Sequence, residues 1–458
     1  MKNQREHWGS RIGFILAAAG SAIGLGSLWR FPYMAGQSGG GVFVLLYLIF
    51  TFVIALPVFI GEILIGRKSQ KSVVLALGEL SNGSNNWKLV GWFNILTTFL
   101  ILSYYTVISG WCLNYMMMSI NNFTHGKTVT EIANIFGIMY NSGDINLFWN
   151  FIFILLNAGV VYGGIRKGIE HWAKILTPAL LFILIGLFIF STTLPGFKDA
   201  AKFVLLPDMS KVTPSSILNA LAMSFFTLSV GLGILTTYGS YMKPQEDMPK
   251  TGAIVASMTV LVSLFAALMI FPIIFSFGFE PQAGTGLVFK TLPILFAKLP
   301  GTVVISTIFF MLLVFTALTS SISLFEVMIS NLIEVFPLTR DKAIVISAVS
   351  VFVMGIPAAL TGTGILFGNW TSLYGKDYFS TVDYLTGNWM MLITAFLMTI
   401  FVGWILDKNI AQQEFVKGTR WAKLFTPWRF FVRWIAPIAI IVVILQEGGI
   451  LDVNKLFT

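Results

Sequence analysis

The stretch that decides the fold lies near the start of the chain and reads Gly20-Ser21-Ala22-Ile23-Gly24-Leu25-Gly26-Ser27-Leu28-Trp29-Arg30-Phe31-Pro32. It lies inside an apolar run long enough to cross a bilayer, yet it contains three glycines, two serines and an arginine. Lipid offers no hydrogen bonds, so a weakened helix at membrane depth needs protein or a water-filled cavity around its free backbone groups. We therefore predict a broken membrane helix, which is a ready-made site for an ion and a substrate.

A second stretch repeats this pattern near the middle of the chain: Thr227-Leu228-Ser229-Val230-Gly231-Leu232-Gly233. The two Gly-Leu-Gly segments fall in the first and sixth predicted helices. An odd number of helices per repeat inserts the second repeat upside down, and inverted repeats with matching breaks are typical of secondary transporters. The alternative is that the glycines only allow close helix packing, and Gly20 and Gly24 have the spacing for it. The recurrence of small polar residues beside the glycines favours transport.

The composition predicts an all-α membrane protein. Of the 458 residues, 56% are hydrophobic and only 11% are charged, whereas a soluble domain carries about 25% charged residues. The single cysteine, Cys112, excludes an internal disulfide framework, and no Walker A loop or nucleophile–base pair suggests an ATPase or another enzyme. Apolar runs predict about eleven transmembrane helices, at 11–36, 41–67, 89–122, 148–163, 169–193, 216–240, 251–278, 301–335, 341–361, 384–407 and 430–446.

The basic residues predict the orientation. Most of the 29 Lys and Arg residues fall on the side of the N-terminus, and we place that side in the cytoplasm and the C-terminus outside. This bias also accounts for the net charge of +9, so a nucleic-acid partner is unnecessary. We expect a multi-pass protein of the plasma (inner) membrane. The opposite side has only Lys127, Lys198, Lys202, Lys211, Lys290, Lys298, Lys376 and Lys455.

Motifs spread along nearly the whole chain carry a family resemblance. In order and spacing they are Arg5-Glu6-His7-Trp8, the Gly20–Pro32 stretch, Gly39-Gly40-Gly41, Gly61-Glu62, Tyr104-Tyr105, Lys167-Gly168-Ile169-Glu170, Pro207-Asp208, Phe225-Phe226-Thr227-Leu228-Ser229, Leu318-Thr319-Ser320-Ser321 and Arg433-Trp434-Ile435-Ala436-Pro437. The chain resembles the neurotransmitter:sodium symporter family, especially bacterial amino-acid transporters of the leucine-transporter (LeuT-type) fold.

The resemblance implies one transporter domain over 1–458 that carries a small zwitterion with sodium by alternating access. Repeat one would cover about 11–193 and repeat two about 216–407, with an extra helix at about 430–446. Family members usually have twelve helices, and some bacterial members stop after eleven, as this chain is expected to do.

The resemblance also implies sodium sites made of oxygen ligands, which suit a hard cation. The first site departs from the family, which usually has asparagines where this chain has Ser27 and Thr259; Ala22 and Thr227 remain. The hydroxyls of serine and threonine reach less far than the amide of asparagine. The site is therefore either kept, with the help of a water molecule or a small backbone shift, or lost. We expect one sodium ion and leave the second open. The second site is intact, with carbonyls of Gly20, Ile23 and Thr316 and hydroxyls of Thr319 and Ser320.

The chloride region departs from the family as well. Tyr47, Thr227 and Ser263 match the chloride-dependent pattern, but Met223 stands where glutamine is usual. A thioether is a poor anion ligand, so we expect uptake without chloride.

The substrate site follows from the same resemblance. The substrate carboxylate would meet amides around Leu25 and Gly26 and the hydroxyl of Tyr105, because helix N-termini suit anions. Gly24 favours an amino acid, since relatives that carry monoamines have aspartate there. The ammonium would meet carbonyls near Ala22, Phe226 and Thr227 and the Ser229 hydroxyl. The side-chain pocket, mostly apolar, would contain Ser21, Leu25, Ile101, Phe226, Ser229, Leu232, Ser320, Ser321 and Leu324; ordinary helix packing is the alternative for each apolar residue taken singly.

Two gates are implied. Arg30 would pair with Asp383 on the outer side, above Tyr105 and Phe226. On the cytoplasmic side Arg5 would pair with Glu334, and Trp8, Ser240 and Tyr241 would complete the gate. Glu62 would satisfy backbone amides near the breaks. Glu326 stands where glutamine is common, and it either takes part in proton antiport or faces the inner vestibule.

We expect a sodium-coupled symporter of a neutral, hydrophobic amino acid. Three alternatives stay open: a membrane sensor that kept the fold, a transporter with altered ion coupling, and, less favoured, a channel. The sequence does not indicate the oligomeric state.

Overall fold

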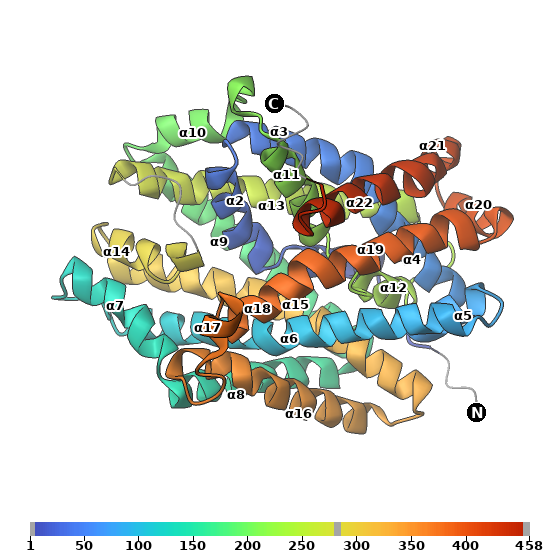
Figure 1. The fold of residues 1–458 in the computed structure, drawn as a ribbon, viewed down its shortest axis with the longest axis horizontal. Coiled ribbons are helices and arrows are strands. Elements are labelled where there is room, and N and C mark those ends of the chain that lie inside the picture. Colours follow the sequence, from blue (N-terminus) through green and yellow to red (C-terminus); the bar gives the residue numbers. More distant parts are fainter. Residues whose placement is uncertain (1–4, 279–284, 452–458) are drawn as a thin grey trace.

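The computed structural model describes residues 5–278 and 285–451, and helices make up its regular structure throughout (Figure 1). Nine continuous helices in these ranges are long and apolar enough to span a membrane. They are Gly41–Ser69 (α3, α4), Asn85–Ile120 (α6), Gly143–Tyr162 (α8), Gly164–Thr192 (containing α9), Met248–Ser276 (α13), Thr302–Val335 (α15), Arg340–Thr363 (containing α16), Tyr378–Ile405 (α18, α19) and Ala422–Glu447 (α21, α22).

The first predicted helix is broken where the sequence indicated. α1 (Arg11–Ala22) stops after Ala22, and the chain resumes as a wide helical turn, Gly26–Arg30, that runs into α2 (Phe31–Gln37). The two halves are bent by 52°. Together they form a tenth span, so the break at Ile23–Leu25 lies inside the membrane.

The sixth predicted helix is broken more widely. α11 (Pro214–Thr227) and α12 (Ile234–Gly239) are each too short to span a membrane, which is why the sixth of the eleven predicted spans is not among the continuous ones. Between them the backbone takes left-handed angles, with φ of +54° at Ser229, +85° at Gly231 and +68° at Gly233. Glycine takes such angles readily, whereas Ser229 is strained there.

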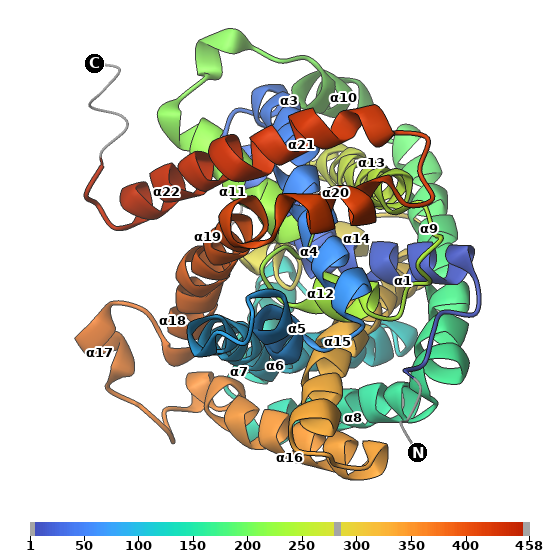
Figure 2. The same cartoon turned by 90° about the vertical axis from the view of Figure 1, so that its right-hand side faces the viewer.

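Short helices outside the spans lie at the two ends of the bundle (Figure 1). α7 (Val129–Tyr140), α10 (Phe197–Leu205), α14 (Thr291–Ala297) and α17 (Trp370–Tyr374) lie toward one end. α5 (Val73–Leu80) and α20 (Lys408–Val416) lie at the other end, which Figure 2 views face-on.

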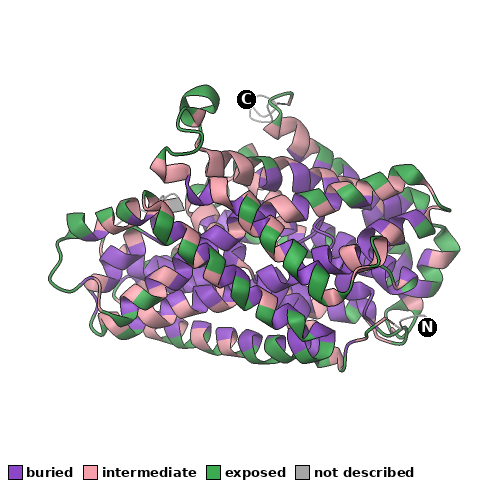
Figure 3. Ribbon diagram, turned by 90° about the horizontal axis from the view of Figure 1, so that it is seen from below, coloured by how far each residue is buried: buried purple, intermediate pink, exposed green. Residues whose placement is uncertain are grey.

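Buried residues follow the centre of the bundle, and exposed apolar residues lie on its outer helices (Figure 3). α15 packs along α6, α9 and α1, so it touches the first half of the chain over most of its length. This arrangement places α15 directly beside the break in the first helix.

Backbone-to-backbone packing fixes α12 against α4. A Cβ atom at Gly66 would lie 1.9 Å from the carbonyl oxygen of Thr236, and one at Gly239 would lie 2.6 Å from that of Ile63. Only glycine fits at these two positions. Close packing against α4 therefore holds α12 in place, although α12 is short.

This packing predicts the effect of one methyl group. We expect Gly66→Ala to lower the stability of the protein by about 1–3 kcal/mol, because α4 and α12 must separate. The measurement is the midpoint of thermal unfolding in detergent. Gly186→Ala is the matched control, since no atom lies within 4 Å of a Cβ there. Equal midpoints for both variants would contradict the packing described.

Candidate substrate and ion site

A cavity opens between the two broken helices, α6 and α15, and has about 1090 Å³ of empty space. Its charged lining residues are Arg30 and Asp383, and most of its surface is apolar. The lining residues are Ser21, Ala22, Gly24, Leu25, Gly26, Trp29, Arg30, Tyr33, Met34, Ile101, Tyr104, Tyr105, Ile108, Phe226, Thr227, Ser229, Leu232, Ile234, Ser320, Leu324 and Asp383.

All of the predicted substrate residues line this cavity except Ser321. The Ser321 hydroxyl donates to Asn157 Oδ1 at 2.6 Å on α8, away from the cavity. The sequence interpretation missed several lining residues, among them Tyr104 and Ile108. Helical spacing could have found these two, because residues 101, 104, 105 and 108 share one face of α6.

Buried side chains satisfy the unwound backbone between α11 and α12. Glu62 Oε1 accepts from the amide of Gly231 at 2.7 Å, which confirms its predicted role. Asn94 donates to the Gly231 carbonyl at 2.9 Å, and Thr98 donates to the Leu232 carbonyl at 2.7 Å. These three side chains replace helical hydrogen bonds at a depth where water and lipid would not.

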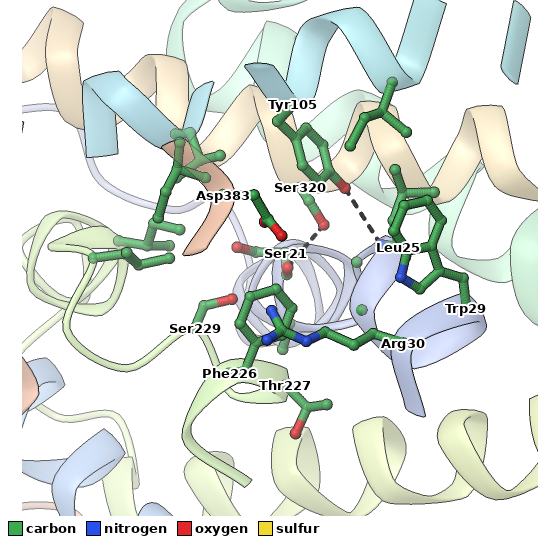
Figure 4. Close-up of a pocket in the computed structure, with 18 of the residues that line it drawn as sticks. Ser21, Leu25, Trp29, Arg30, Tyr105, Phe226, Thr227, Ser229, Ser320 and Asp383 are labelled. Carbon is green, nitrogen blue, oxygen red and sulfur yellow. Dashed lines mark hydrogen bonds between the residues drawn. The ribbon is translucent and has the colours of Figure 1, made fainter. Parts of the chain in front are cut away.

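The break in the first helix meets α6 and α15. The amide of Leu25 donates to Tyr105 Oη at 3.3 Å, and the Ser320 hydroxyl donates to the Ser21 carbonyl at 2.9 Å (Figure 4). A Cβ at Gly24 would lie 2.9 Å from Ser320 Oγ and 3.6 Å from Tyr105 Oη. Any side chain at position 24 would therefore fill the space between these two hydroxyls.

The aromatic ring of Phe226 forms part of the cavity wall next to the first helix break. A Cβ at Gly26 would lie 2.3 Å from this ring, so the ring packs directly on the glycine backbone. The guanidinium of Arg30 lies 4.6 Å above the centre of the same ring (Figure 4). Arg30 also donates to Asn388 Oδ1 at 3.4 Å.

The predicted outer pair is not formed. Arg30 and Asp383 line the same cavity, but within the described part of the chain no ion pair joins them. Arg30 instead makes a cation–π contact with the Phe226 ring and a hydrogen bond with Asn388. No Arg30–Asp383 ion pair therefore closes the cavity on this side in the described part of the chain.

The contacts predicted for Arg5 are present. Arg5 makes an ion pair with Glu334 and donates to Ser240 Oγ at 2.5 Å, and its guanidinium lies 4.6 Å from the centre of the Tyr241 ring. The indole of Trp8 is fully buried and donates to the Tyr238 carbonyl at 3.0 Å. These contacts close the end of the bundle at which Arg5 lies.

Glu326 belongs to this inner network. Its carboxylate is fully buried, makes a 2.5 Å ion pair with Arg340 and accepts from Tyr241 Oη at 2.7 Å. Sequence reasoning gave Glu326 no partner, because Arg340 begins the next helix and spacing alone does not pair them. Through Tyr241, whose ring lies beside Arg5, Glu326 is connected to the cluster around Arg5.

The residues predicted for the second sodium site lie where α1 meets α15. The carbonyl of Ile23 leaves the helical direction, with ψ of 68°. A Cβ at Gly20 would lie 3.1 Å from Thr319 Cβ, and the Thr319 hydroxyl donates to the Thr316 carbonyl at 3.0 Å. Ser320 Oγ lies 3.4 Å from the Gly20 carbonyl oxygen. Helix α15 thus presents the Ser320 hydroxyl to the carbonyls at the end of α1, and the Thr319 side chain packs beside Gly20.

The residues predicted for the first sodium site differ in how they are bonded. Ser27 is fully buried, and its hydroxyl has no hydrogen-bond partner among the residues described. Thr259 donates to the Val255 carbonyl at 3.0 Å, and Thr227 donates to Met223 at 2.9 Å. Each threonine oxygen keeps a lone pair for a cation. Ala22 and Thr227 line the cavity described above, whereas Ser27 and Thr259 do not.

The neighbouring chloride region is held by hydroxyl contacts. Tyr47 Oη donates to Thr227 Oγ1 at 3.0 Å and lies 3.4 Å from Ser263 Oγ. Met223 is buried and lines an adjoining cavity with Asn219. No group of three His, Cys, Asp or Glu side chains in the described ranges is placed to hold a metal ion, so cations here would depend on carbonyls and hydroxyls.

Comparison with known proteins agrees with this architecture. The model of the Sodium:neurotransmitter symporter family matches residues 5–134 and 127–451. An uncharacterized sodium-dependent transporter, YhdH of Bacillus subtilis, is 36% identical over 97% of this chain and 98% of its own length. An uncharacterized sodium-dependent transporter of Haemophilus influenzae is 37% identical, with the same coverage of both chains.

A solved structure is also similar. The crystal structure of MhsT in complex with L-phenylalanine superposes with a TM-score of 0.88 at 36% identity, over 97% of this chain and 100% of that one. This match confirms the predicted LeuT-type fold, and the relatives are transporters rather than enzymes. The chain therefore belongs to the sodium:neurotransmitter symporter family and is a sodium-dependent membrane transporter.

Proposed function

We propose that the protein is a sodium-coupled symporter of a neutral, hydrophobic amino acid and works by alternating access. The observation that carries the proposal is the cavity, whose polar groups gather at the two helix breaks and whose remaining wall is apolar. A zwitterion needs an anion site and a cation site close together, and an apolar side chain needs an uncharged wall.

The amino-acid backbone fits the two breaks. The carboxylate would accept hydrogen bonds from the amides around Leu25 and from the hydroxyl of Tyr105. The Leu25 amide and the Tyr105 hydroxyl already lie together in the structure. The ammonium would meet carbonyls at the ends of α1 and α11. An aspartate or a larger residue at position 24 would occupy this space, so Gly24 supports a substrate that brings its own carboxylate.

The amino-acid side chain would lie among Ile101, Ile108, Leu232 and Leu324, which are buried and apolar. A charged side chain would lose its hydration there without gaining a partner. The similar protein MhsT was solved with L-phenylalanine. This supports a large hydrophobic amino acid, although the lining does not single out one member of that class.

Sodium at the second site would couple the two halves of the chain. It would join carbonyls of α1 to hydroxyls of α15, and so favour an outward-open, inside-closed arrangement. Its release toward the inside would free the end of α1 and permit the inner gate to open. Sodium and substrate would bind together because both depend on the same helix break.

We propose that the first sodium site is also kept. A buried hydroxyl without a partner costs about 1–3 kcal/mol, and a cation beside Ser27 would remove this penalty. Thr227 and Thr259 contribute further oxygens, and the substrate carboxylate would complete the set.

A sensor that kept the fold is the second candidate. Candidate gate residues at both ends of the cavity argue against it, because a sensor needs access from one side only. Arg30 and Asp383 at the outer side and Arg5 and Glu334 at the inner side support transport between the two faces.

The remaining expectations complete the proposal. The protein would lie in the plasma (inner) membrane with its N-terminus in the cytoplasm and its C-terminus outside. Repeat one would extend over about 11–193 and repeat two over about 216–407, with the extra helix at about 430–446.

Uptake tests the proposed function. In proteoliposomes with an inward sodium gradient, we expect accumulation of at least one of phenylalanine, leucine, methionine and tryptophan, and none without sodium. Thr319→Val should raise the half-saturating sodium concentration about tenfold or more, because a charge-assisted ligand is lost. Thr316→Val is the control, since position 316 supplies only its carbonyl. Sodium-independent uptake, or no uptake of any amino acid, would overturn the proposal.

The sodium count tests the first site. We expect a Hill coefficient for sodium clearly above one in the wild type and near one in Ser27→Ala. Ser224→Ala should leave it unchanged, because that buried hydroxyl donates to the Leu221 carbonyl at 2.7 Å within its own helix. A wild-type coefficient near one would mean that the first site is lost.

Anion replacement tests chloride coupling. Uptake should be unchanged when gluconate replaces chloride on both sides of the membrane, because Tyr47 already donates its proton to Thr227 and Met223 offers no anion ligand. A steep dependence of uptake on chloride concentration would refute this expectation.

A further inference from the structure

A second cavity lies at the end of the bundle that we propose to be cytoplasmic, remote from the substrate site. It has about 810 Å³ of empty space and opens at the surface. Figure 2 views this end, where the start of α1, the start of α13 and the loop after α20 come together. Its lining residues are Arg11, Asp247, Lys250, Gly418, Arg420 and Trp421.

Three cations converge on this cavity without an ion-pair partner. Other basic residues at the same end are paired, as Arg67 is with Glu414 and Arg340 with Glu326. For Arg11, Lys250 and Arg420, no ion pair is present in the part of the chain that the structure describes. Bringing like charges together is unfavourable unless an anion joins them.

The donors of Arg11 are only partly used. Its Nε lies 3.3 Å from the Thr251 hydroxyl, to which it donates, but Nη2 is buried and has no partner among the described residues. A guanidinium has five donors in a fixed fork that matches a phosphate group. Arg11 is thus held in place on one side and unsatisfied on the other.

The carboxylates nearby do not neutralise the cluster. Asp247 Oδ1 accepts from the amide of Lys250 at 3.1 Å and so caps α13. Glu246 lies in the same loop and its charge acts on Arg11, but the charge acts on Lys243 and Arg67 as well, so three cations share this one carboxylate. The lining itself carries three positive side chains against one negative one, which leaves an excess of positive charge.

Apolar residues flank the cavity on the chain. Ile12 follows Arg11 and is exposed, and Leu424 is exposed three residues after Trp421, which is itself exposed. Tryptophan is enriched at the level of lipid headgroups, and exposed aliphatic side chains suit acyl chains. A water-soluble anion would need the cations but not this apolar border.

We propose that this cavity binds the phosphate of an anionic phospholipid headgroup, with Arg11, Lys250 and Arg420 as its ligands and Trp421 beside the glycerol. Anionic lipids gather in the cytoplasmic leaflet and occupy basic pockets between helices there. The bound lipid joins the first residue of α1 to α13 and to the loop after α20. Arg5 and Trp8 precede Arg11 on the same segment, so the lipid steadies the closed inner gate.

The test is lipid binding to the purified full chain in a neutral detergent, read as the midpoint of thermal unfolding. We expect phosphatidylglycerol to raise the midpoint by about 2–4 °C, whereas phosphatidylcholine and inorganic phosphate at the same concentration do not. Lys250→Gln and Arg420→Gln should each weaken the apparent affinity for phosphatidylglycerol about fivefold.

Lys423→Gln is the matched control, because Lys423 is exposed in the same loop and does not line the cavity. It should bind phosphatidylglycerol like the wild type. Both lining variants change exposed side chains, and their midpoints without lipid will show that they fold. The proposal is overturned if all three variants respond alike, if phosphatidylcholine acts as phosphatidylglycerol does, or if inorganic phosphate gives the same rise, which would assign the site to free phosphate.

Discussion

The structure depends on one constraint: two helices are unwound in the middle of a membrane, and their backbone groups must still be bonded. In the sixth helix, three side chains from α4 and α6 satisfy this constraint: Glu62, Asn94 and Thr98. They form hydrogen bonds with the backbone of Gly231 and Leu232. In the first helix, the side chains of Tyr105 and Ser320 form the corresponding hydrogen bonds with the backbone. Because every one of these partners lies on another helix, the breaks exist only in the assembled bundle.

The same constraint joins structure to transport. Backbone groups that are bonded by side chains rather than by their own helix can exchange those partners for a substrate or an ion. Tyr105 and Ser320 lie at the positions where a carboxylate and a sodium ion would add contacts. A rigid, continuous helix would offer no such groups at this depth.

The sequence predicted the spans well, because apolar runs with clear breaks are a strong signal for membrane helices. The break in the first helix was located to within a few residues, since Gly24 and Gly26 weaken it locally. Three features of the structure could not be predicted from the sequence. The direction of Ser321 depends on helix rotation, and the partner of Glu326 comes from across a loop. Arg30 contacts Phe226 and Asn388, which are remote from it in the sequence, rather than Asp383. None of these leaves a local pattern in the chain.

The buried Trp8 side chain fixes the start of the described chain against α12. Its ring lies edge-on to Phe14, Tyr238 and Tyr241, with centroid distances of 5.7, 5.2 and 6.2 Å, and none of it is exposed. Moving the Trp8 ring out of these contacts would expose an aromatic surface of roughly 150–250 Å². The hydrophobic free energy lost would be about 4–6 kcal/mol at about 25 cal/mol per Å². Any rearrangement that moves the Trp8 ring away from Tyr238 and Tyr241 must therefore draw about this much free energy from other interactions, such as the binding of a ligand.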